Sequence, residues 1–324
     1  MQKKITVVLG TGGTIAGRAA SGDDNTGYTA GQISASDLVA AIPSLSDLPL
    51  EFEQLAQLDS KNMDNATWQR LAHRAAAHLA RPEVGGVVVT HGTDTVEETA
   101  YFLHRVLAPG KPVVFTAAMR PASSRQADGP QNLVDAITVS RSAEGCGVVV
   151  AVAGRVHSPI DVFKAYPYQL DAFSSGDSGP LALIEEGRIR QLRPWPVSLD
   201  AVGTAALPAD PAAWPRVELL VSHAGSDGRM VEALLNSGVA GLVVAGCGNA
   251  NVHVALEVAL LHAQTQGIPV WRSTRCLLGT VVTQGLSASE AAAGHLPTTP
   301  LSPVKARVEL MLRLMTVPPN PAPH

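Results

Sequence analysis

The feature that most constrains the fold of this chain is a recurring unit: an apolar run, a small polar turn and a segment of helical length. The apolar runs of the first half are residues 5–9, 85–90, 112–116 and 147–152. The segments of helical length between them are residues 65–79, 96–107 and 128–141. Short continuous apolar runs are typical of buried parallel strands, and their alternation with helices indicates βαβ units. The sequence therefore predicts an α/β domain with a mostly parallel sheet flanked by helices.

A proline-rich stretch interrupts this pattern and predicts a division into two domains. Prolines occur there at Pro194, Pro196, Pro208, Pro211 and Pro215. Because such density is typical of a linker, we predict a linker over residues 191–215. It separates a larger N-terminal domain (residues 1–190) from a smaller C-terminal α/β domain (residues 216–324) with its own parallel sheet. The length of 324 residues fits two domains of about 100–200 residues each.

Composition narrows the functional classes. Hydrophobic residues make up 46% of the chain and charged residues 16%, as is usual for a globular α/β enzyme. The net charge of −4 gives no reason to expect a nucleic acid or membrane partner. No uncharged run approaches the roughly 18 residues of a membrane span, and Met1 leads into the first strand without the apolar region of a signal peptide. We therefore expect a cytoplasmic protein.

The three cysteines, Cys146, Cys247 and Cys276, are far apart in the sequence and form no CxxC pair. This number and spacing predict neither a disulfide framework nor a structural zinc site. Because each cysteine lies in or beside an apolar run, we expect buried, inert thiols.

The first apolar run ends in the turn Gly10-Thr11-Gly12-Gly13-Thr14-Ile15. Ligands of open α/β sheets bind beyond the carboxyl ends of the strands, and glycines bring backbone N–H groups close to them. Thr14 is therefore a candidate nucleophile. The turn is a poor dinucleotide fingerprint, because Ile15 occupies the third glycine position, and it is not a P-loop, because no Lys-Ser or Lys-Thr follows. On this turn alone, a plain tight turn without chemistry remains an equal alternative.

Other predicted strand ends carry small polar side chains as well: Ser60, Thr93 with Asp94, and the turn after Ala118. The carboxyl ends of parallel strands share one edge of a sheet, so these groups can converge. Hydroxyls, a carboxylate and glycine-presented N–H groups suit acyl transfer on a small polar substrate. Tyr28 is the only aromatic residue of the polar loop 16–31, where it is either an anchor or part of a lid with a functional hydroxyl.

Two longer motifs make the chain recognisable. Residues 11–17 (TGGTIAG) and 90–100 (THGTDTVEETA) resemble the signatures of the bacterial-type L-asparaginase family. Further matches follow in the family's order: Ala118-Met119-Arg120-Pro121, residues 128–133 (DGPQNL), Gly248-Asn249-Ala250-Asn251 and Lys305-Ala306-Arg307-Val308. The resemblance implies an amidohydrolase that converts L-asparagine to L-aspartate and ammonia without a cofactor or metal. It also implies a homotetramer whose active sites lie at the intimate dimer interface.

The resemblance also implies roles for individual residues. The catalytic group that it implies is Thr14 as nucleophile, Tyr28 on the lid loop 16–31, and Thr93 with Asp94 and Lys164. The substrate-binding group that it implies is Ser60, Lys61, Asp94, Ala118 and, from a neighbouring subunit, Asn251. Ser60 and Asp94 match the clamps on the substrate's α-carboxylate and α-ammonium, and Ala118 matches a backbone contact to the side-chain amide.

Two departures from the family pattern leave selectivity open. Lys61 stands where the family commonly has Gln, and its cation either strengthens carboxylate binding or points to solvent. No acidic residue near Gly285 and Leu286 matches the one that some relatives donate from the neighbouring subunit, so glutamine is a second possible substrate. Acylation of Thr14 and direct attack by a water that Thr93 activates are both compatible with these residues.

Other interpretations are less well supported by the sequence. His91 with Asp94 and Glu97 has a spacing that a metal site could use, but we expect a structural hydrogen bond at the strand end. A glutaminase-asparaginase is the nearest rival, and an amidase subunit of a tRNA amidotransferase normally carries an extra N-terminal domain. A nucleotide-binding sensor lacks a complete fingerprint here, and an amino-acid racemase requires a pair of cysteines on facing strand ends.

Overall fold

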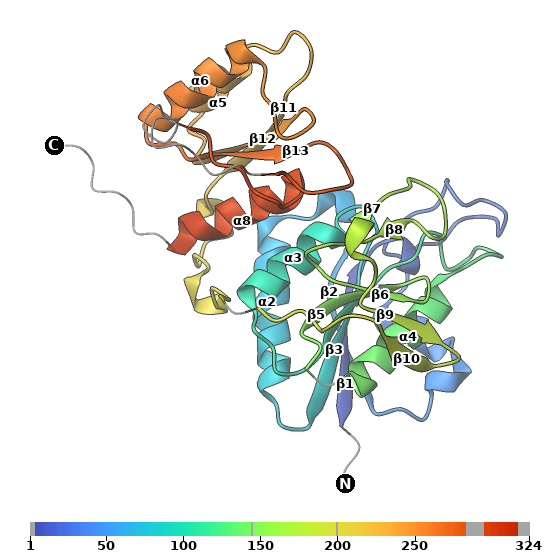
Figure 1. Ribbon diagram of the computed structural model, residues 1–324. Helices are drawn as coiled ribbons and strands as arrows, with labels where there is room; N and C mark the ends of the chain where they lie inside the picture. Colours follow the sequence, from blue (N-terminus) through green and yellow to red (C-terminus); the bar gives the residue numbers. More distant parts are fainter. Residues whose placement is uncertain (1–3, 144, 199, 283–294, 317–324) are drawn as a thin grey trace. The chain divides into compact units, whose positions relative to one another are not determined.

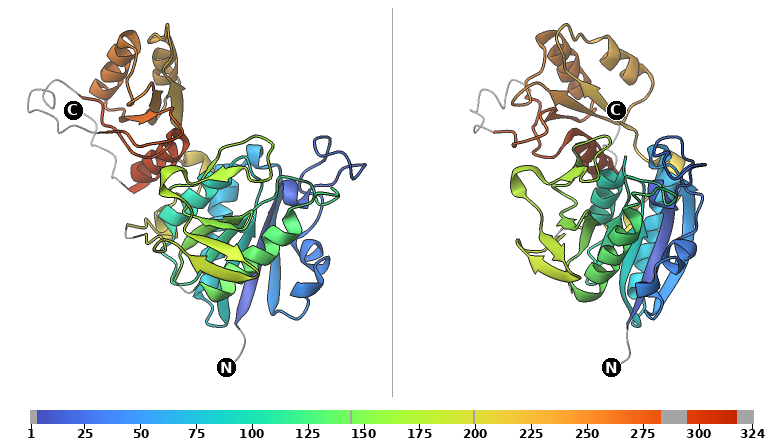
Figure 2. Two further views of the ribbon diagram at one scale, coloured as in Figure 1. Left: turned by 45° about the vertical axis from the view of Figure 1, so that its right-hand side comes forward. Right: turned by 90° about the vertical axis from the view of Figure 1, so that its right-hand side faces the viewer.

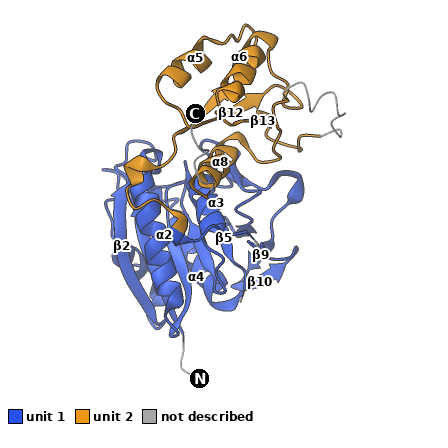
Figure 3. Cartoon of the chain, turned by 90° about the vertical axis from the view of Figure 1, so that its left-hand side faces the viewer, with its two compact units in different colours: residues 1–205 blue, residues 206–324 orange. Residues whose placement is uncertain are grey.

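The computed structural model describes residues 4–143, 145–198, 200–282 and 295–316 (Figure 1). The chain divides into two structural units, residues 1–205 and residues 206–324 (Figure 3). The predicted linker over residues 191–215 spans this division, and its own boundaries stay a prediction.

The first unit is built on an eight-stranded sheet with the order β10-β9-β6-β5-β4-β3-β1-β2. The parallel strands are β1 (Ile5–Gly12), β2 (Leu50–Leu58), β3 (Val84–Thr90), β4 (Val113–Thr116) and β5 (Val148–Val152). The antiparallel strands are β6 (Arg155–His157), β9 (Ala182–Glu185) and β10 (Arg188–Gln191). The apolar runs predicted β1, β3, β4 and β5, whereas the antiparallel strands are too short to show a comparable pattern.

Helices cover both faces of this sheet (Figure 2). On one face, α1 (Ala35–Ala40) and α4 (Gly129–Ser142) share a core with Val8, Val88 and Val149. On the other, α2 (Asn65–Ala80) and α3 (Val96–Val106) pack together, with the rings of Trp68 and Phe102 stacked 4.8 Å apart. Alternate residues of the central strands β1, β3, β4 and β5 therefore face two apolar layers, which explains their continuous apolar runs, whereas the edge strand β2 is partly exposed.

The second unit holds a three-stranded parallel sheet with the order β11-β12-β13. Its strands are β11 (Val217–Val221), β12 (Gly241–Gly246) and β13 (Val270–Thr274), and its helices are α5 (Arg229–Asn236), α6 (Val254–Thr265) and α8 (Pro303–Thr316). The predicted fold class, two α/β domains of unequal size with mainly parallel sheets, is confirmed.

The cysteines differ from the prediction. Cys146 is buried, and burial raises the pKa of its thiol to about 12, so this cysteine is inert as expected. Cys247 is only half-buried and Cys276 is exposed, so the prediction of a buried thiol is wrong for Cys276. Cys276 lies beyond the end of β13, where the chain has left the apolar layer. Among the described residues, no helix is both long and apolar enough to cross a membrane.

Candidate active site

Thr14 lies in a short 3-10 helix (Thr14–Ala16) that follows β1 directly. Gly12 and Gly13 precede it with φ values of +103° and +82°, a backbone conformation that residues with a Cβ rarely adopt. A Cβ on Gly13 would lie 2.4 Å from Cα of Gly92, in the turn after β3. The two turns therefore pack backbone against backbone, and the glycines bring Thr14 next to the end of β3.

Tyr28 reaches Thr14 from the loop that follows. The Tyr28 hydroxyl lies 2.7 Å from Oγ1 of Thr14, at hydrogen-bonding distance, and Thr14 is 7% exposed. The loop closes on itself through backbone hydrogen bonds between Arg18 and Thr29. A Cβ on Gly17 would lie 2.8 Å from the Tyr28 ring, so a glycine at this position makes room for the tyrosine.

A second polar group follows β3. Lys164, on the two-residue strand β7 (Phe163–Lys164), donates hydrogen bonds to Oγ1 of Thr93 at 2.9 Å and to Oδ1 of Asp94 at 2.6 Å. The side chain of Lys164 is 17% exposed, whereas that of Asp94 is 50% exposed. The cation is thus held between a hydroxyl and a carboxylate, and the carboxylate stays within reach of a ligand.

Ser60 joins this group from the end of β2. It is 1% exposed, and its Oγ accepts a hydrogen bond of 3.2 Å from the backbone N–H of Asp94. Its carbonyl accepts a hydrogen bond of 2.8 Å from the Thr95 hydroxyl. A Cβ on Gly92 would lie 2.5 Å from Oγ of Ser60, which again requires glycine. The structure therefore brings Ser60, Thr93, Asp94 and Lys164 together.

The Lys61 side chain is exposed, unlike that of the buried Ser60. Its side chain is 67% exposed, and its ammonium pairs with Asp59 at 3.0 Å. The pKa of Lys61 is raised, first by Asp59 and to a smaller extent by Asp94 and Tyr28. The ammonium thus lies in solvent but within electrostatic range of the site.

Ala118 follows β4 and is 1% exposed. It packs against Ile15 and Ala16, beside the turn that carries Thr14. The Asp128 carboxylate accepts hydrogen bonds of 2.9 Å from the backbone N–H groups of Met119 and Arg120, so the turn after Ala118 is fixed. No role was predicted for Asp128 from the sequence. Its position ahead of α4 was recognisable, but its contacts with the turn depend on the fold.

His91 is fully buried at the end of β3. Its Nδ1 donates a hydrogen bond of 2.7 Å to the Gly92 carbonyl, which is the structural hydrogen bond predicted for it. Burial lowers the pKa of His91 to about 4, so the ring is neutral near pH 7. Among the described residues, no cluster of three or more His, Cys, Asp or Glu side chains is arranged to hold a metal ion.

Two further predictions concern Asn251 and the segment around Gly285 and Leu286. Asn251 belongs to the second unit and is described within that unit. It follows β12, and its backbone forms hydrogen bonds of 2.7 and 2.8 Å with Cys247. Gly285 and Leu286 lie outside the described residues.

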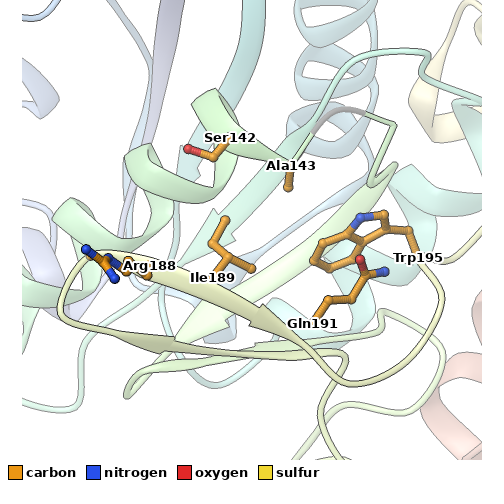
Figure 4. A pocket seen from close by; sticks show the side chains of 7 residues that line it. Ser142, Ala143, Arg188, Ile189, Gln191 and Trp195 are labelled. Atoms are coloured by element: carbon orange, nitrogen blue, oxygen red, sulfur yellow. The ribbon is translucent and has the colours of Figure 1, made fainter.

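A hollow of about 670 Å³ lies in the first unit between the C-terminal end of α4 and strand β10 (Figure 4). Ser142 and Ala143 line one side, and Arg188, Ile189 and Trp195 line the other (Figure 4). None of the predicted site residues lines this hollow. The candidate active site is instead the polar cluster at the carboxyl ends of β1, β2, β3 and β4.

Comparisons with known proteins identify the family of the chain. The family described as "Asparaginase, N-terminal" matches residues 5–196, and "Glutaminase/Asparaginase C-terminal domain" matches residues 216–318. A probable periplasmic L-asparaginase of Haemophilus influenzae is 36% identical, with 95% of this chain and 87% of that protein covered. A glutaminase-asparaginase of Pseudomonas fluorescens is 33% identical, with 95% of this chain and 85% of that protein covered.

The fold is also similar to that of a solved structure. The crystal structure of a probable cytoplasmic L-asparaginase from Campylobacter jejuni has a TM-score of 0.90 and 37% sequence identity, and the match covers 97% of this chain and 96% of that one. These matches extend over both structural units. The chain therefore belongs to the asparaginase family.

Proposed function

We propose that this protein hydrolyses the side-chain amide of L-asparagine to L-aspartate and ammonia, with Thr14 as the nucleophile. The observation that carries the proposal is the 2.7 Å contact between the Thr14 and Tyr28 hydroxyls, next to the group formed by Thr93, Asp94 and Lys164. Relatives named L-asparaginase, at 35–36% identity over most of the chain, support the substrate.

The first step makes an ester on Thr14. A threonine hydroxyl is a weak nucleophile and must lose its proton as it attacks. The Tyr28 hydroxyl lies within reach to take that proton while it donates its own proton to the leaving amide nitrogen, so it acts as a proton relay. The Lys61 ammonium interacts with Tyr28 only weakly, because it lies in solvent. The carbon–nitrogen bond breaks, ammonia leaves, and an aspartyl ester remains on Thr14.

The second step hydrolyses this ester. We assign it to Thr93, whose hydroxyl already accepts a hydrogen bond of 2.9 Å from Lys164. Lys164 first releases one of its protons to solvent and then takes the Thr93 proton, while Thr93 takes a proton from the attacking water. The proton held by Lys164 returns through Thr93 to the leaving Thr14 oxygen, which gives aspartate and free Thr14. The backbone N–H near Thr93 is the proposed oxyanion donor, a contact typically worth about 3 kcal/mol of barrier.

The substrate is held by its α-substituents. The Ser60 hydroxyl accepts from the Asp94 N–H and keeps its own proton to donate to the α-carboxylate. The half-exposed Asp94 carboxylate receives the α-ammonium in a charge-assisted contact, and the Ala118 carbonyl receives the side-chain amide. Because two glutaminase-asparaginases of Pseudomonas are 33% identical to this chain, L-glutamine is the second candidate substrate.

We further propose a homotetramer in the cytoplasm, in which Asn251 of a neighbouring subunit completes each site. Exposed apolar side chains on α5 and α6 support an oligomer: Met230 is 59% exposed, Val254 71% and Val258 65%. The location draws support from the name of the Campylobacter jejuni structure, whereas the Haemophilus influenzae relative is named periplasmic. Within each chain, the division into residues 1–190, 191–215 and 216–324 remains our prediction.

The test of this function is ammonia release from L-asparagine and L-glutamine by the wild type and by Thr14→Ala. We expect the wild type to hydrolyse asparagine and Thr14→Ala to lose at least about a thousandfold in kcat. Ser21→Ala, an exposed change in the same loop, is the matched control and should retain wild-type kcat. Near-normal turnover by Thr14→Ala would refute the assignment.

A further inference from the structure

The loop that brings Tyr28 onto Thr14 rests on a second segment, residues 122–125, which we call the strap. Four hydrogen bonds join them. In the backbone, the Ala122 N–H donates to Gly17 at 3.0 Å and the Arg125 N–H donates to Gly22 at 3.1 Å. The other two use strap side chains: Ser123 Oγ accepts from the Ala19 N–H at 2.8 Å, and Ser124 Oγ donates to Oδ1 of Asn25 at 2.6 Å. Figure 1 shows the two segments projecting beside each other.

Of these four hydrogen bonds, the one between Ser124 and Asn25 lies nearest in sequence to Tyr28. Ser124 is 8% exposed, and its Oγ also accepts a hydrogen bond of 3.0 Å from the Gln126 N–H. The hydroxyl oxygen thus has an N–H donor on one side, while its proton points to Asn25. A buried hydroxyl that both donates and accepts a hydrogen bond has a fixed orientation, so the Ser124 hydroxyl can determine the position of the Asn25 side chain.

A hydrogen-bonded turn connects Asn25 to Tyr28. The Asp24 carboxylate accepts hydrogen bonds from the backbone N–H groups of Thr26 at 3.0 Å and Gly27 at 2.7 Å. These contacts, first that of Gly27, hold the pKa of Asp24 below its ordinary value. The turn therefore stays formed near neutral pH, and its hydrogen bonds hold the backbone of Thr26 and Gly27, which join Asn25 to Tyr28.

The strap itself is fixed to the proposed substrate site. It begins one residue after Pro121, in the same turn as Ala118 and Arg120, whose backbone is held by Asp128. The Ser124 N–H donates to the Pro121 carbonyl at 2.9 Å. A single segment thus runs from Ala118, whose carbonyl the proposed function assigns to the side-chain amide, to the hydrogen bonds that hold the Tyr28 loop.

We propose that Ser124 and Asn25 are positioning residues that hold the Tyr28 hydroxyl on Thr14. The proposal rests on the proposed function, since it assigns the contact an effect on the acylation step. Losing one such hydrogen bond costs about 0.5–1.5 kcal/mol, which corresponds to a rate effect of roughly 2- to 12-fold.

The test compares Ser124→Ala, Asn25→Ala and the double variant with the wild type. Each single change should lower kcat on L-asparagine about 2- to 12-fold with a smaller effect on KM, because the fold and the α-substituent contacts remain. The double variant should be no slower than the worse single variant, since both remove one contact. Ser124→Thr keeps the hydroxyl and should restore kcat, and Ser21→Ala should match the wild type.

Hydrogen exchange of residues 17–31 provides a readout that does not need turnover. We expect faster exchange in both single variants and wild-type exchange in Ser124→Thr. Wild-type kcat and wild-type exchange in Ser124→Ala would overturn the proposal, as would additive losses in the double variant. If the wild type releases no ammonia, the proposed function fails, whereas the exchange data still decide whether the strap holds the loop.

Discussion

At the scale of single residues, the site depends on backbone that only glycine can supply. Gly13 and Gly92 lie so close that a Cβ on Gly13 would come within 2.4 Å of the opposite Cα. Gly92 in turn leaves room for Ser60 Oγ. These close approaches place Thr14, Ser60 and Thr93 on neighbouring turns, although the residues are far apart in sequence.

His91 supports this arrangement and makes stability depend on pH. Its pKa is about 4 in the folded chain, because of burial, against an ordinary value of 6.5. The unfolded chain therefore binds an additional proton between these values. The stability that His91 contributes is complete above pH 6.5 and is lost as the pH falls toward 4.

This leads to a prediction for His91→Asn, which cannot titrate. The wild type should lose about 2 kcal/mol of unfolding free energy between pH 7 and pH 5 through this residue, and the variant should lack that part of the pH dependence. Urea unfolding at the two pH values measures it, with the exposed His73→Asn as control. An unchanged pH dependence in His91→Asn would show that burial does not hold the ring neutral.

Lys61 gives a second prediction at this scale. Its exposed ammonium interacts with Asp94 and Tyr28 only at a distance, so its effect on substrate should be that of a surface charge. Lys61→Gln should raise the KM for L-asparagine about 2- to 5-fold and change kcat less, because solvent screens an exposed charge and leaves it only a small effect. Steady-state kinetics at low and high salt test this. Equal KM values at low salt would mean that Lys61 serves only its partner Asp59.

At the scale of elements, the placement of Lys164 depends on a very short hairpin. Strands β7 and β8 (Phe173–Ser174) pair over two residues each, and such a ladder is marginal without further contacts. Arg120 supplies one such contact to the segment between the two strands. It is 6% exposed, donates a hydrogen bond of 2.8 Å to the Tyr168 carbonyl and stacks 4.0 Å from the Tyr168 ring centroid.

We therefore predict that Arg120→Ala displaces Lys164 from Thr93 and Asp94. kcat should fall about 10- to 100-fold, the usual effect of a small misplacement at a reacting centre, and Arg120→Lys should recover only part of it. Arg141→Ala, on an exposed position of α4, should behave as the wild type. A kcat within twofold of the wild type in folded Arg120→Ala would show that the hairpin holds Lys164 without this contact.

The strands also show how much of the fold could be predicted from the sequence. Continuous valine runs predicted β3, β4 and β5, because strands buried on both faces need apolar residues throughout. The antiparallel strands β6, β9 and β10 were not predicted, since their three or four residues carry charged side chains and little periodicity. Thr14, Thr93 and Asp94 could be named from their motifs. The roles of Asp128, Arg120 and Ser124 required the tertiary contacts, which join residues up to 99 positions apart.

At the scale of the whole molecule, the proposed sharing of sites between subunits can be tested by mixing inactive chains. Thr14→Ala lacks the proposed nucleophile, and Asn251→Ala lacks the proposed partner residue. Chains of the two kinds that are unfolded and refolded together should form some sites with both residues. About one quarter of the wild-type activity should then return, as expected for random pairing across a two-fold interface.

Separate refolding followed by mixing without exchange is the control. Activity equal to the mean of the two separate variants would show that Asn251 acts within its own chain or not at all. Sedimentation of the wild type gives the number of chains directly, and we expect four.

The central claim is that Thr14 becomes covalently acylated during turnover, and trapping that ester tests it most directly. Lys164→Met should slow hydrolysis of the ester more than its formation, because Lys164 contacts Thr93 and not Thr14. After rapid acid quench with L-asparagine, mass spectrometry should find an aspartyl group on the peptide that contains Thr14. Continued ammonia release with the aspartyl group on Thr93, or on no residue at all, would contradict the account.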